Sequence, residues 1–358
     1  MGIIYPVSTS DDNMKQNNFA SDNNINPNNQ LKYIKSKFVL QLIFHNIKKM
    51  RQLKLVRYNK NLQDKLELDF IEFTSIKCLK EFGKKYNLML TLDDREINLK
   101  WKYGGNELLD YLSKINFNNI QILDISENKI SDISPLLKMN MKNLREINLK
   151  CNEITNIKIL EKVNFENLQV LNLSYTKNPN LDIFKNLEKL YLSHNEISDL
   201  NPLLFVNYNN LKILDLNNNI IDDIDLLEGV EFNKLELLDL SNNQIINISK
   251  LENANFISLK YLYLSHNKIT DIKALEKAKF NNLKDLRLNN NKIFDITPLV
   301  NLKQLEIIDA SENNISDISL FKRANFDELK QITLYGNLIN DYYSYKNLFM
   351  SKRIKMYY

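Results

Sequence analysis

His194 and His266 are the residues whose type and spacing first suggest chemistry. They occupy the same place in two identical Tyr-Leu-Ser-His-Asn strings. Imidazole is a common zinc ligand and general base. The strings lie three repeats apart in the periodic pattern described below, which separates the two side chains by roughly 14 Å at about 4.8 Å per strand. Because each ligand nitrogen lies only about 2 Å from zinc, the two histidines cannot share a metal ion.

Other catalytic arrangements are also missing from the sequence. Neither histidine has a serine or cysteine nucleophile and an orienting acid at a matched spacing, and Cys151 belongs to a distant repeat. The chain has six glycines and no glycine-rich loop that could cradle a phosphate. The recurring Asp and Asn side chains lack the mixed spacing of a calcium site. We therefore predict that the chain is not an enzyme and has no catalytic residue, metal or cofactor.

Residues suited to binding another protein are frequent. Aromatic and charged side chains stand between regularly spaced leucines, at places where a protein-binding surface would expose them. For the Asp and Asn members, a purely solubilising role is the alternative. The predicted protein-binding residues are Tyr191, His194, Asp215, Asp239, Tyr261, Tyr263, His266, Asp285, Arg287 and Asp309. Of these, the group around Tyr261, Tyr263, His266 and Arg287 is the first choice.

A repeated pattern positions these residues. It has the form L-x-x-L-x-L-x-x-N, as in Leu211, Leu214, Leu216 and Asn219. Nine copies end in asparagine and a tenth ends in Thr176. The asparagines are Asn128, Asn152, Asn195, Asn219, Asn243, Asn267, Asn291, Asn313 and Asn337. Successive anchors follow one another at a nearly constant step of about 24 residues, a period that predicts a solenoid. The step from Thr176 to Asn195 is the shortest.

Each copy predicts one short strand and one turn. Leu214 and Leu216 point to one face of an extended segment, while Ile213 and Asp215 point to the other. One strand cannot bury its own leucines, so the strands must stack into a parallel sheet. We expect the anchor asparagine to bond backbone groups in the turn, and the Asp or Asn four residues later to cap a short helix. An aromatic residue three places before most first leucines predicts a stacked column in the core.

The pattern resembles the leucine-rich-repeat superfamily over about residues 97–340. Its L-x-x-L-x-L-x-x-N-x-I-x-D-I form is similar to the class found in the regulatory subunit of protein phosphatase 1 and in bacterial internalins. The resemblance implies an α/β solenoid, shaped as a horseshoe with a parallel concave sheet, short helices or turns on the convex side and a helical N-terminal cap. It also implies a rigid recognition arc, whereas the partners of those families do not carry over.

The chain divides into four predicted segments. Residues 1–30 are an Asn-rich disordered tail, 31–96 a helical F-box-like or capping region, 97–341 the solenoid and 342–358 a C-terminal cap. Within the solenoid, Leu99 and Trp101 lie one repeat period before Leu123 and Ile125 and predict a degenerate capping strand. The short step after Thr176 predicts a local change of curvature between residues 174 and 186.

Residues 31–66 resemble a divergent F-box. Ile43 and Phe44 match the family's Ile-Phe pair, and Leu53 and Val56 match its L-x-x-V run, but the Leu-Pro start is absent. The resemblance implies that this segment binds a Skp-type adaptor. The alternative is a helical cap that only covers the first strand.

Composition restricts location and partners. The net charge of +4 on a chain with 26% charged residues is too small to indicate nucleic acid. Two cysteines, the lack of an apolar stretch long enough to span a membrane and an N-terminus unlike a signal peptide favour a reducing compartment. We expect a cytoplasmic or nuclear protein that binds neither nucleic acid nor membranes. Its predicted function is to bind a protein partner on the concave face, with an F-box-type substrate receptor of a ubiquitin ligase or a phosphatase regulatory subunit as alternatives.

Overall fold

The computed structural model describes residues 94–358 except 118, 178, 180–186 and 207, and before them only residues 78, 81–86 and 90. All of these belong to the second of two units, Met1–Phe73 and Thr74–Tyr358. The predicted disordered tail and the F-box-like segment therefore lie outside the described residues. So does most of the predicted helical N-terminal cap, although residues 81–86 are helical.

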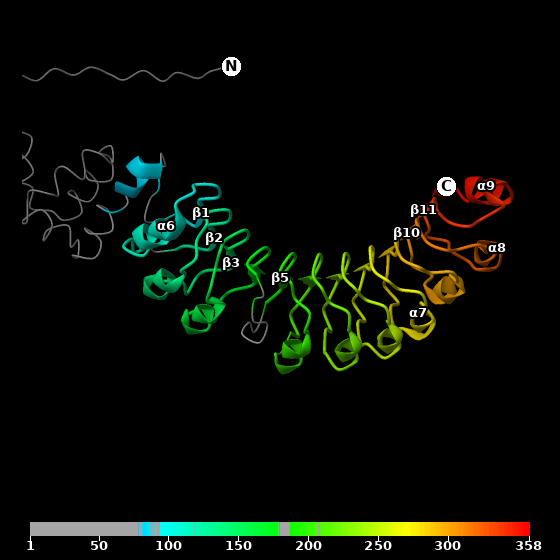
Figure 1. Ribbon diagram of the computed structural model, residues 1–358, viewed down its shortest axis with the longest axis horizontal. Helices are drawn as coiled ribbons and strands as arrows, with labels where there is room; N and C mark the ends of the chain where they lie inside the picture. Colours follow the sequence, from blue (N-terminus) through cyan, green and yellow to red (C-terminus); the bar gives the residue numbers. More distant parts are fainter. Residues whose placement is uncertain are drawn as a thin grey trace, which may run out of the picture. The chain divides into compact units, whose positions relative to one another are not determined.

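The described chain forms one parallel sheet, in which twelve strands follow one another in sequence order (Figure 1). Each strand has three residues, and its middle residue points into the core. The pairing keeps one register throughout, as in Leu214 opposite Leu238 and Leu262. The strands are β1 Glu96–Asn98, β2 Ile122–Asp124, β3 Glu146–Asn148, β4 Val170–Asn172, β5 Lys189–Tyr191, β6 Ile213–Asp215, β7 Leu237–Asp239, β8 Tyr261–Tyr263, β9 Asp285–Arg287, β10 Ile307–Asp309, β11 Gln331–Thr333 and β12 Lys355–Tyr357.

Short helical segments connect the strands and lie on the convex side of the arc (Figure 1). Most are single 3-10 turns, because each repeat leaves only a few residues for the return path. They are α6 Gly105–Leu112, η2 Ser134–Lys138, η3 Ile157–Lys162, η4 Asn201–Phe205, η5 Asp225–Glu228, η6 Ser249–Glu252, α7 Ala274–Lys277, η7 Thr297–Asn301 and α8 Leu320–Arg323. The predicted horseshoe with a concave parallel sheet and convex turns is confirmed for these residues.

The core runs as continuous columns between the sheet and the convex turns. The leucines at the middle of the strands are fully buried, and so are isoleucines two residues after the anchors such as Ile221 and Ile245. Behind them lies the predicted aromatic column, in which the ring centroids of Phe232, Phe256 and Phe280 follow one another at 5.7 and 6.0 Å. Each repeat thus contacts only its neighbours, as a solenoid requires.

The anchor asparagines join successive repeats. Asn219 donates to the carbonyls of Leu216 in its own repeat and Leu192 in the preceding one, at 2.8 and 3.0 Å. Its Oδ1 accepts the backbone N–H groups of Asn195 and Ile197 at 2.9 and 3.0 Å. The predicted role in bonding backbone groups is confirmed, and the bonds reach across the repeat boundary as well as within the turn.

The residue before each anchor has a left-handed backbone. The φ angle lies between 51° and 67° at these ten residues and at Trp101, which takes the equivalent place after β1. We call the set the left-handed column: Trp101, Glu127, Cys151, Tyr175, His194, Asn218, Asn242, His266, Asn290, Glu312 and Gly336. The chain turns sharply out of the strand at this place. Asn and His tolerate such a backbone better than most residues, because their short polar side chains bond locally. His194 and His266 therefore both stand where the chain needs a residue that tolerates a left-handed backbone.

The Asp or Asn four residues after the anchor bonds the start of the convex turn, as predicted. In most repeats, however, it stands one residue before the N-cap. Asp223 accepts the backbone N–H of Asp225 at 2.7 Å, and Ile224 between them holds the N-cap position. The same bond spans two residues in six other repeats, at 2.7 to 2.8 Å. Two described members of this series occupy an N-cap themselves. Asn156 is the N-cap of η3 and makes no side-chain capping bond, whereas Asp341 caps helix α9 Tyr342–Ser351 and accepts from Ser344 at 3.1 Å.

The first strand corrects the predicted register of the capping strand. Ile97 pairs with Leu123, so Leu99 takes the place equivalent to Ile125 and both core positions are fully buried. Trp101 instead falls in the left-handed column and is 57% exposed. The step from the first strand to the second is therefore longer than the common repeat period. At the other end, α9 and β12 continue the unit, and β12 pairs with β11 in parallel.

The repeat with the short step from Thr176 to Asn195 keeps its place in the sheet. Strands β4 and β5 pair in the common register, with Leu171 opposite Leu190. Thr176 replaces the anchor asparagine and donates to the carbonyl of Leu173 at 2.7 Å, while Asn195 accepts the N–H groups of Thr176 and Lys177. The convex segment, where we expect the change of curvature, lies mostly outside the described residues, so that expectation stays a prediction.

Candidate protein-binding face

The concave face consists of the first and third residues of each strand. Parallel pairing in one register arranges them in two rows that cross the strands. The first-residue row includes Lys189, Ile213, Leu237, Tyr261, Asp285 and Ile307, and the third-residue row includes Tyr191, Asp215, Asp239, Tyr263, Arg287 and Asp309. Eight of the ten predicted binding residues belong to these rows. His194 and His266 lie beside them in the left-handed column.

Most Asp and Asn side chains of the third-residue row have a backbone task. Asp239 accepts the N–H of Ser241 at 2.9 Å, two residues on, and this bond turns the chain out of the strand. Asp124, Asn148, Asn172, Asp215 and Asp309 make the same bond at 2.9 to 3.1 Å. The residue type at these places is therefore explained by the fold. The informative members of the row are the residues that replace Asp or Asn, namely Tyr191, Tyr263, Arg287, Thr333 and Tyr357.

Tyr263 and Arg287 form a network around Asp285. The Arg287 guanidinium donates to both carboxylate oxygens of Asp285, at 3.2 and 3.0 Å, and its central carbon lies 4.5 Å from the centre of the Tyr263 ring. The Tyr263 hydroxyl donates to the same carboxylate at 3.3 Å. This two-pronged contact fixes the guanidinium plane and leaves about half of the Arg287 side chain exposed (47%).

The predicted exposure of Asp285 is not observed. This residue is 5% exposed, because Arg287 and Tyr263 cover the carboxylate. Burial, followed by the charge of Asp285, raises the pKa of Tyr263 to about 12, so the phenol remains protonated and donates. The hydrogen bond to Asp285 raises the pKa of Arg287 in turn. Asp285 thus holds Tyr263 and Arg287 in place and is itself buried beneath them.

The other two residues of the predicted patch, Tyr261 and His266, differ in their distance from the Tyr263–Arg287 pair. Tyr261 pairs with Asp285 in the register of β8 and β9, and it is exposed beside Tyr263 and Arg287. His266 is also exposed, but its left-handed backbone places it past the strand end. The structure therefore brings Tyr261, Tyr263 and Arg287 together and leaves His266 at the edge.

Tyr191 and His194 belong to a second locality. The His194 ring stacks on Tyr175, with centroids 3.9 Å apart and planes inclined by 12°, and the Lys150 amine lies 5.8 Å from the Tyr175 ring. Burial and the charge of Lys150 lower the pKa of His194, so the imidazole is neutral at physiological pH. Burial, then Asp215 and Glu146, raise the pKa of Tyr191. His194 and His266 thus have equivalent backbones and different surroundings.

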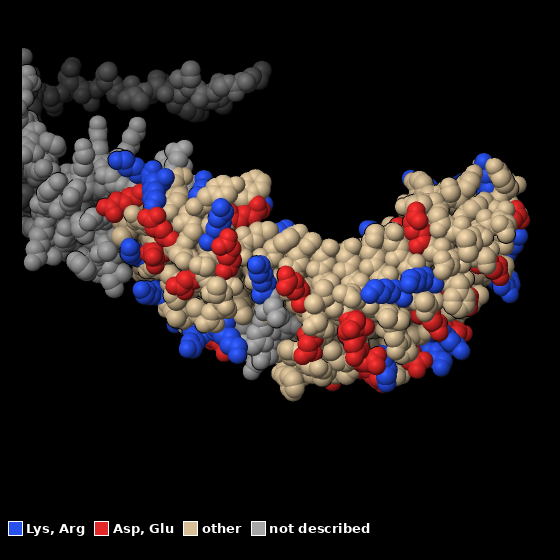
Figure 2. Space-filling view, in the orientation of Figure 1, with Lys and Arg blue, Asp and Glu red and all other residues tan. Residues whose placement is uncertain are grey.

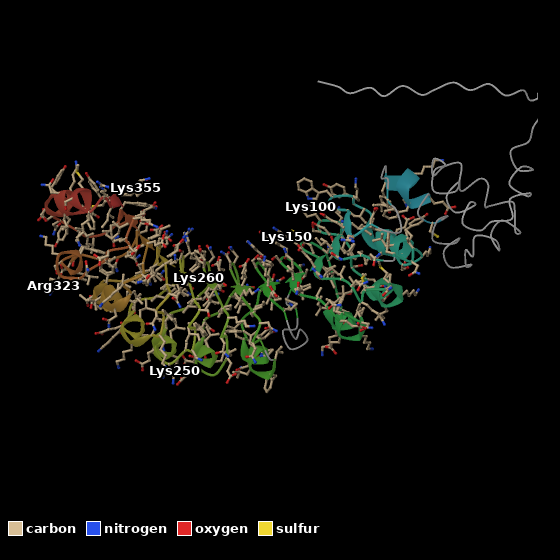
Figure 3. All side chains as sticks on the ribbon, turned by 180° about the vertical axis from the view of Figure 1, so that it is seen from behind. Lys100, Lys150, Lys250, Lys260, Arg323 and Lys355 are labelled. Carbon is tan, nitrogen blue, oxygen red and sulfur yellow. The ribbon has the colours of Figure 1, made fainter. Side chains whose placement is uncertain are left out.

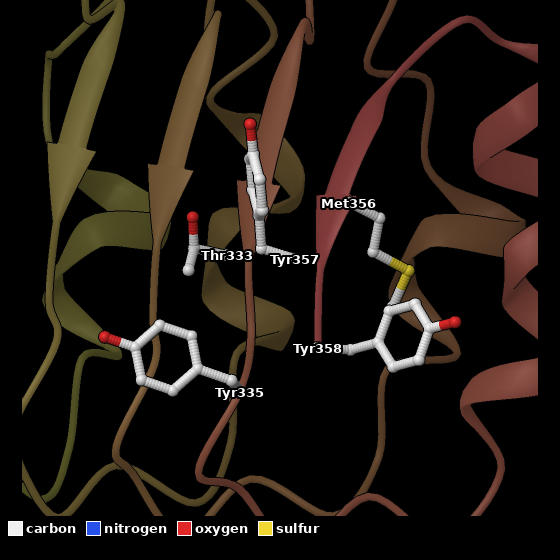
Figure 4. A pocket seen from close by; sticks show the side chains of 5 residues that line it. All are labelled: Thr333, Tyr335, Met356, Tyr357 and Tyr358. Atoms are coloured by element: carbon white, nitrogen blue, oxygen red, sulfur yellow. The ribbon is translucent and has the colours of Figure 1, made fainter.

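An aromatic hollow that was not predicted lies at the C-terminal end of the face (Figure 4). It is lined by Thr333, Tyr335, Met356, Tyr357 and Tyr358. Strand β12 brings Tyr357 beside Thr333, and Tyr335, Tyr357 and Tyr358 are each about half exposed. A signal for it was present in the sequence, because Tyr357 follows Thr333 by one repeat period.

Acidic and basic side chains are interspersed along one flank of the arc (Figure 2). The residues just before the strands supply part of this charge ladder. Lys212 pairs with Glu188 at 2.7 Å and Lys260 with Glu236 at 2.8 Å, while Glu306 bonds both Lys284 and Lys330. Lys260 lies toward the concave edge in Figure 3, whereas Lys250 and Arg323 lie on the convex side. Such exposed pairs contribute little stability and limit which charges are free for a partner.

Metal and membrane features are not found among the described residues. No group of three or more His, Cys, Asp or Glu side chains there could hold a metal ion. None of the helices described combines the length and apolar character that crossing a membrane requires.

Comparison with known proteins identifies the repeats. A family model described as leucine rich repeat matches residues 185–245, and one described as leucine rich repeats (2 copies) matches residues 118–162, 233–277 and 257–302. A search of curated proteins found no match. The described unit is a leucine-rich-repeat solenoid. Such repeats are interaction modules without enzymatic activity, which agrees with the prediction that the chain is not an enzyme.

Solved structures share the fold at low sequence identity. An internalin from Listeria monocytogenes is 24% identical, with 78% of this chain and 88% of that chain covered and a TM-score of 0.57. TLR13, solved in complex with ssRNA13, is 22% identical, with 71% and 37% covered and a TM-score of 0.50. The ectodomain of the receptor kinase GASSHO1/SCHENGEN3 from Arabidopsis thaliana is 23% identical, with 65% and 29% covered and a TM-score of 0.48. At these identities the likeness concerns the fold alone.

Proposed function

We propose that this leucine-rich-repeat chain is a non-enzymatic interaction module that binds a protein partner on its concave face, through residues near Tyr261, Tyr263 and Arg287. One observation carries the proposal. At Tyr263 and Arg287 the third-residue row abandons the Asp or Asn that ends most other strands and presents a rigid, partly exposed Tyr–Arg pair. Tyr and Arg are among the residues most enriched at binding hot spots, and a preformed pair loses little conformational entropy on binding.

The test is affinity capture with mass spectrometry on the intact chain and on three variants, Tyr261→Ala, Tyr263→Ala and His266→Ala. Tyr343→Ala is the matched control, because Tyr343 is 77% exposed on α9, away from the concave rows. We expect Tyr261→Ala and Tyr263→Ala to lose specific partners that the control retains. Identical capture by all variants would mean that this patch is not the binding surface.

A second candidate function rests on residues 31–66, whose Ile43–Phe44 pair and Leu53–Val56 run resemble an F-box. In that case the segment recruits a Skp-type adaptor and the concave face holds the substrate of a ubiquitin ligase. Deleting residues 31–66 should then abolish ligase association while capture of concave-face partners continues. If no adaptor is captured by the intact chain, the segment is a structural cap. Either function suits the proposed cytoplasmic or nuclear location, which rests on the cysteine count.

The phosphatase-regulator alternative rests only on the form of the repeat. It predicts a co-purifying phosphatase that survives deletion of residues 31–66 and is lost from the Tyr263→Ala/Arg287→Ala chain. A phosphatase unaffected by this double change would exclude regulation through the concave patch.

A further inference from the structure

Two carboxylates lie side by side on the concave face. Asp215 and Asp239 are directly opposite one another in the register of β6 and β7, strands that are about 4.8 Å apart. One oxygen of each accepts a backbone N–H from its own turn, Asn217 at 3.0 Å and Ser241 at 2.9 Å. Like charges that face each other on neighbouring strands repel, so this pair disfavours the sheet that carries it.

The described part of the chain provides no salt bridge to either carboxylate. Lys212 and Lys260 on the flank are committed to Glu188 and Glu236, and Arg287 is committed to Asp285. The second oxygen of Asp239 accepts only a neutral amide, that of Asn217 at 3.3 Å. The charge of Lys150 acts on Asp215 but forms no salt bridge with it, so neither carboxylate is paired with a cation of the described repeats.

The surroundings of the pair suit a basic side chain. Tyr191 flanks Asp215 on β5, and Tyr263 flanks Asp239 on β8. Aromatic rings attract cations, and the guanidinium of Arg287 on the Tyr263 ring shows this within the chain. Half-buried Ile213 and Leu237 lie opposite each other in the neighbouring row and form an apolar shelf for the rest of a bound segment.

From these contacts we infer that the sheet face of β5 to β8 docks an extended segment of the partner protein that places one Lys or Arg side chain between Asp215 and Asp239. The inference rests on the proposed function and adds the chemistry of the partner. From Tyr191 to Tyr263 there are three strand steps, roughly 14 Å, which about four residues of extended chain would span. Apolar residues beside the basic one would cover the Ile213–Leu237 shelf.

The test is selection of a displayed library of random nine-residue peptides on the intact chain. Peptides that the Tyr261→Ala/Tyr263→Ala chain still binds are discarded, which leaves ligands of the concave face. Affinities of the selected peptides are then measured by fluorescence polarisation on the Asp215→Asn/Asp239→Asn chain. Asn keeps the acceptor for the turn bond and removes only the charge. Asp124→Asn is the matched control, because Asp124 occupies the same row on β2 and makes the same bond to Ser126.

We expect the selected peptides to share one Lys or Arg with apolar neighbours. Their affinity should fall about tenfold or more on the double Asn chain and change little on the control. Replacing the basic residue of a selected peptide by Gln should lower its affinity for the native chain by the same factor. The same replacement should not lower its affinity for the double Asn chain any further. Concave-face peptides without a shared basic residue, or with equal loss on the control, would overturn the inference and leave the proposed function standing. A library that yields no concave-face ligand would contradict both.

Discussion

At the scale of single residues, the anchor asparagines matter for folding more than for recognition. Asn219 is buried and makes bonds in two repeats. We predict that Asn219→Ala lowers the free energy of unfolding by roughly 3 kcal/mol or more, because it leaves several buried backbone groups unpaired at about 1–3 kcal/mol each. Asn219→Thr should cost less, since Thr176 shows that a hydroxyl keeps one of the bonds. Urea unfolding of both variants measures this order.

Asn255→Ala is the control for that series, because Asn255 is exposed and bonds only the side chain of Asn233 in the described structure. Its free energy of unfolding should change by less than about 0.5 kcal/mol. Equal losses at Asn219 and Asn255 would show that the anchors are not the source of stability.

Asp215 makes the stability of the arc depend on pH. Burial raises its pKa to about 6, and Asp239 adds to this, while the bond from Asn217 and the charge of Lys150 oppose it. Because the folded-state pKa lies above the unfolded value of about 3.9, folding favours the protonated form, and stability falls as the pH rises from about 4 to about 6. Asp215→Asn removes this loss. The free energy of unfolding of the variant, relative to that of the native chain, should therefore be up to about 3 kcal/mol higher at pH 7.5 than at pH 4.

Urea unfolding of both chains at the two pH values measures the gain, and carboxyl NMR of the native chain gives the pKa directly. In the Asp239→Asn chain the pKa of Asp215 should move down. A stability difference that does not vary with pH would disprove the burial argument for Asp215.

At the scale of elements, the aromatic column joins the convex turns of successive repeats. Phe256 is fully buried between the rings of Phe232 and Phe280. We predict that Phe256→Ala costs about 3–5 kcal/mol, the range for an aromatic side chain removed from a packed core. Thermal unfolding measures it. The matched exposed change, Phe294→Ala, affects a side chain that is 62% exposed and should cost little. Comparable losses for the two would contradict the packing described for the column.

How far the elements could be predicted from the sequence depends on periodicity. Strands, convex turns and the two concave rows all follow from a fixed step, so Leu214 and Asp215 could be placed without a structure. The first strand could not, because its step to the second strand exceeds the period and Trp101, a core residue by count, belongs to a turn. The side-chain contacts also escape periodicity. Nothing in the spacing shows that Arg287 folds back over Asp285, two residues away, and buries it.

The two rows of the candidate face could be predicted from the sequence. Which of their side chains are occupied by bonds to the backbone could not. Asp and Asn at the third strand residue looked like surface charges, whereas most of them bond the backbone two residues later. This bond depends on where the strand ends, which a leucine count does not give. Strand β12 was missed because Arg353, Met356 and Tyr358 stand one period after Leu329, Ile332 and Leu334, where leucines were sought.

At the scale of the whole described unit, stability should be a sum over neighbouring repeats. Helix α9 and strand β12 cover β11, so deleting residues 342–358 exposes that strand and its core residues Ile332 and Leu334. We predict faster amide exchange in β10 and β11 and unchanged protection in β2 to β5. Hydrogen exchange with mass spectrometry resolves the two regions. Uniform loss of protection along the sheet would mean that the unit unfolds as one cooperative block.

The parallel order of the sheet makes the concave face a directional surface. All twelve strands run the same way, so the two long edges differ, with the charge ladder before the strands and the left-handed column after them. Such a face has no internal two-fold axis, and a ligand turned end for end meets different chemistry. A partner with two-fold symmetry would therefore offer only one of its halves to each arc and would bind two copies of this chain, one per half. The stoichiometry of a complex thus follows from the direction of the strands.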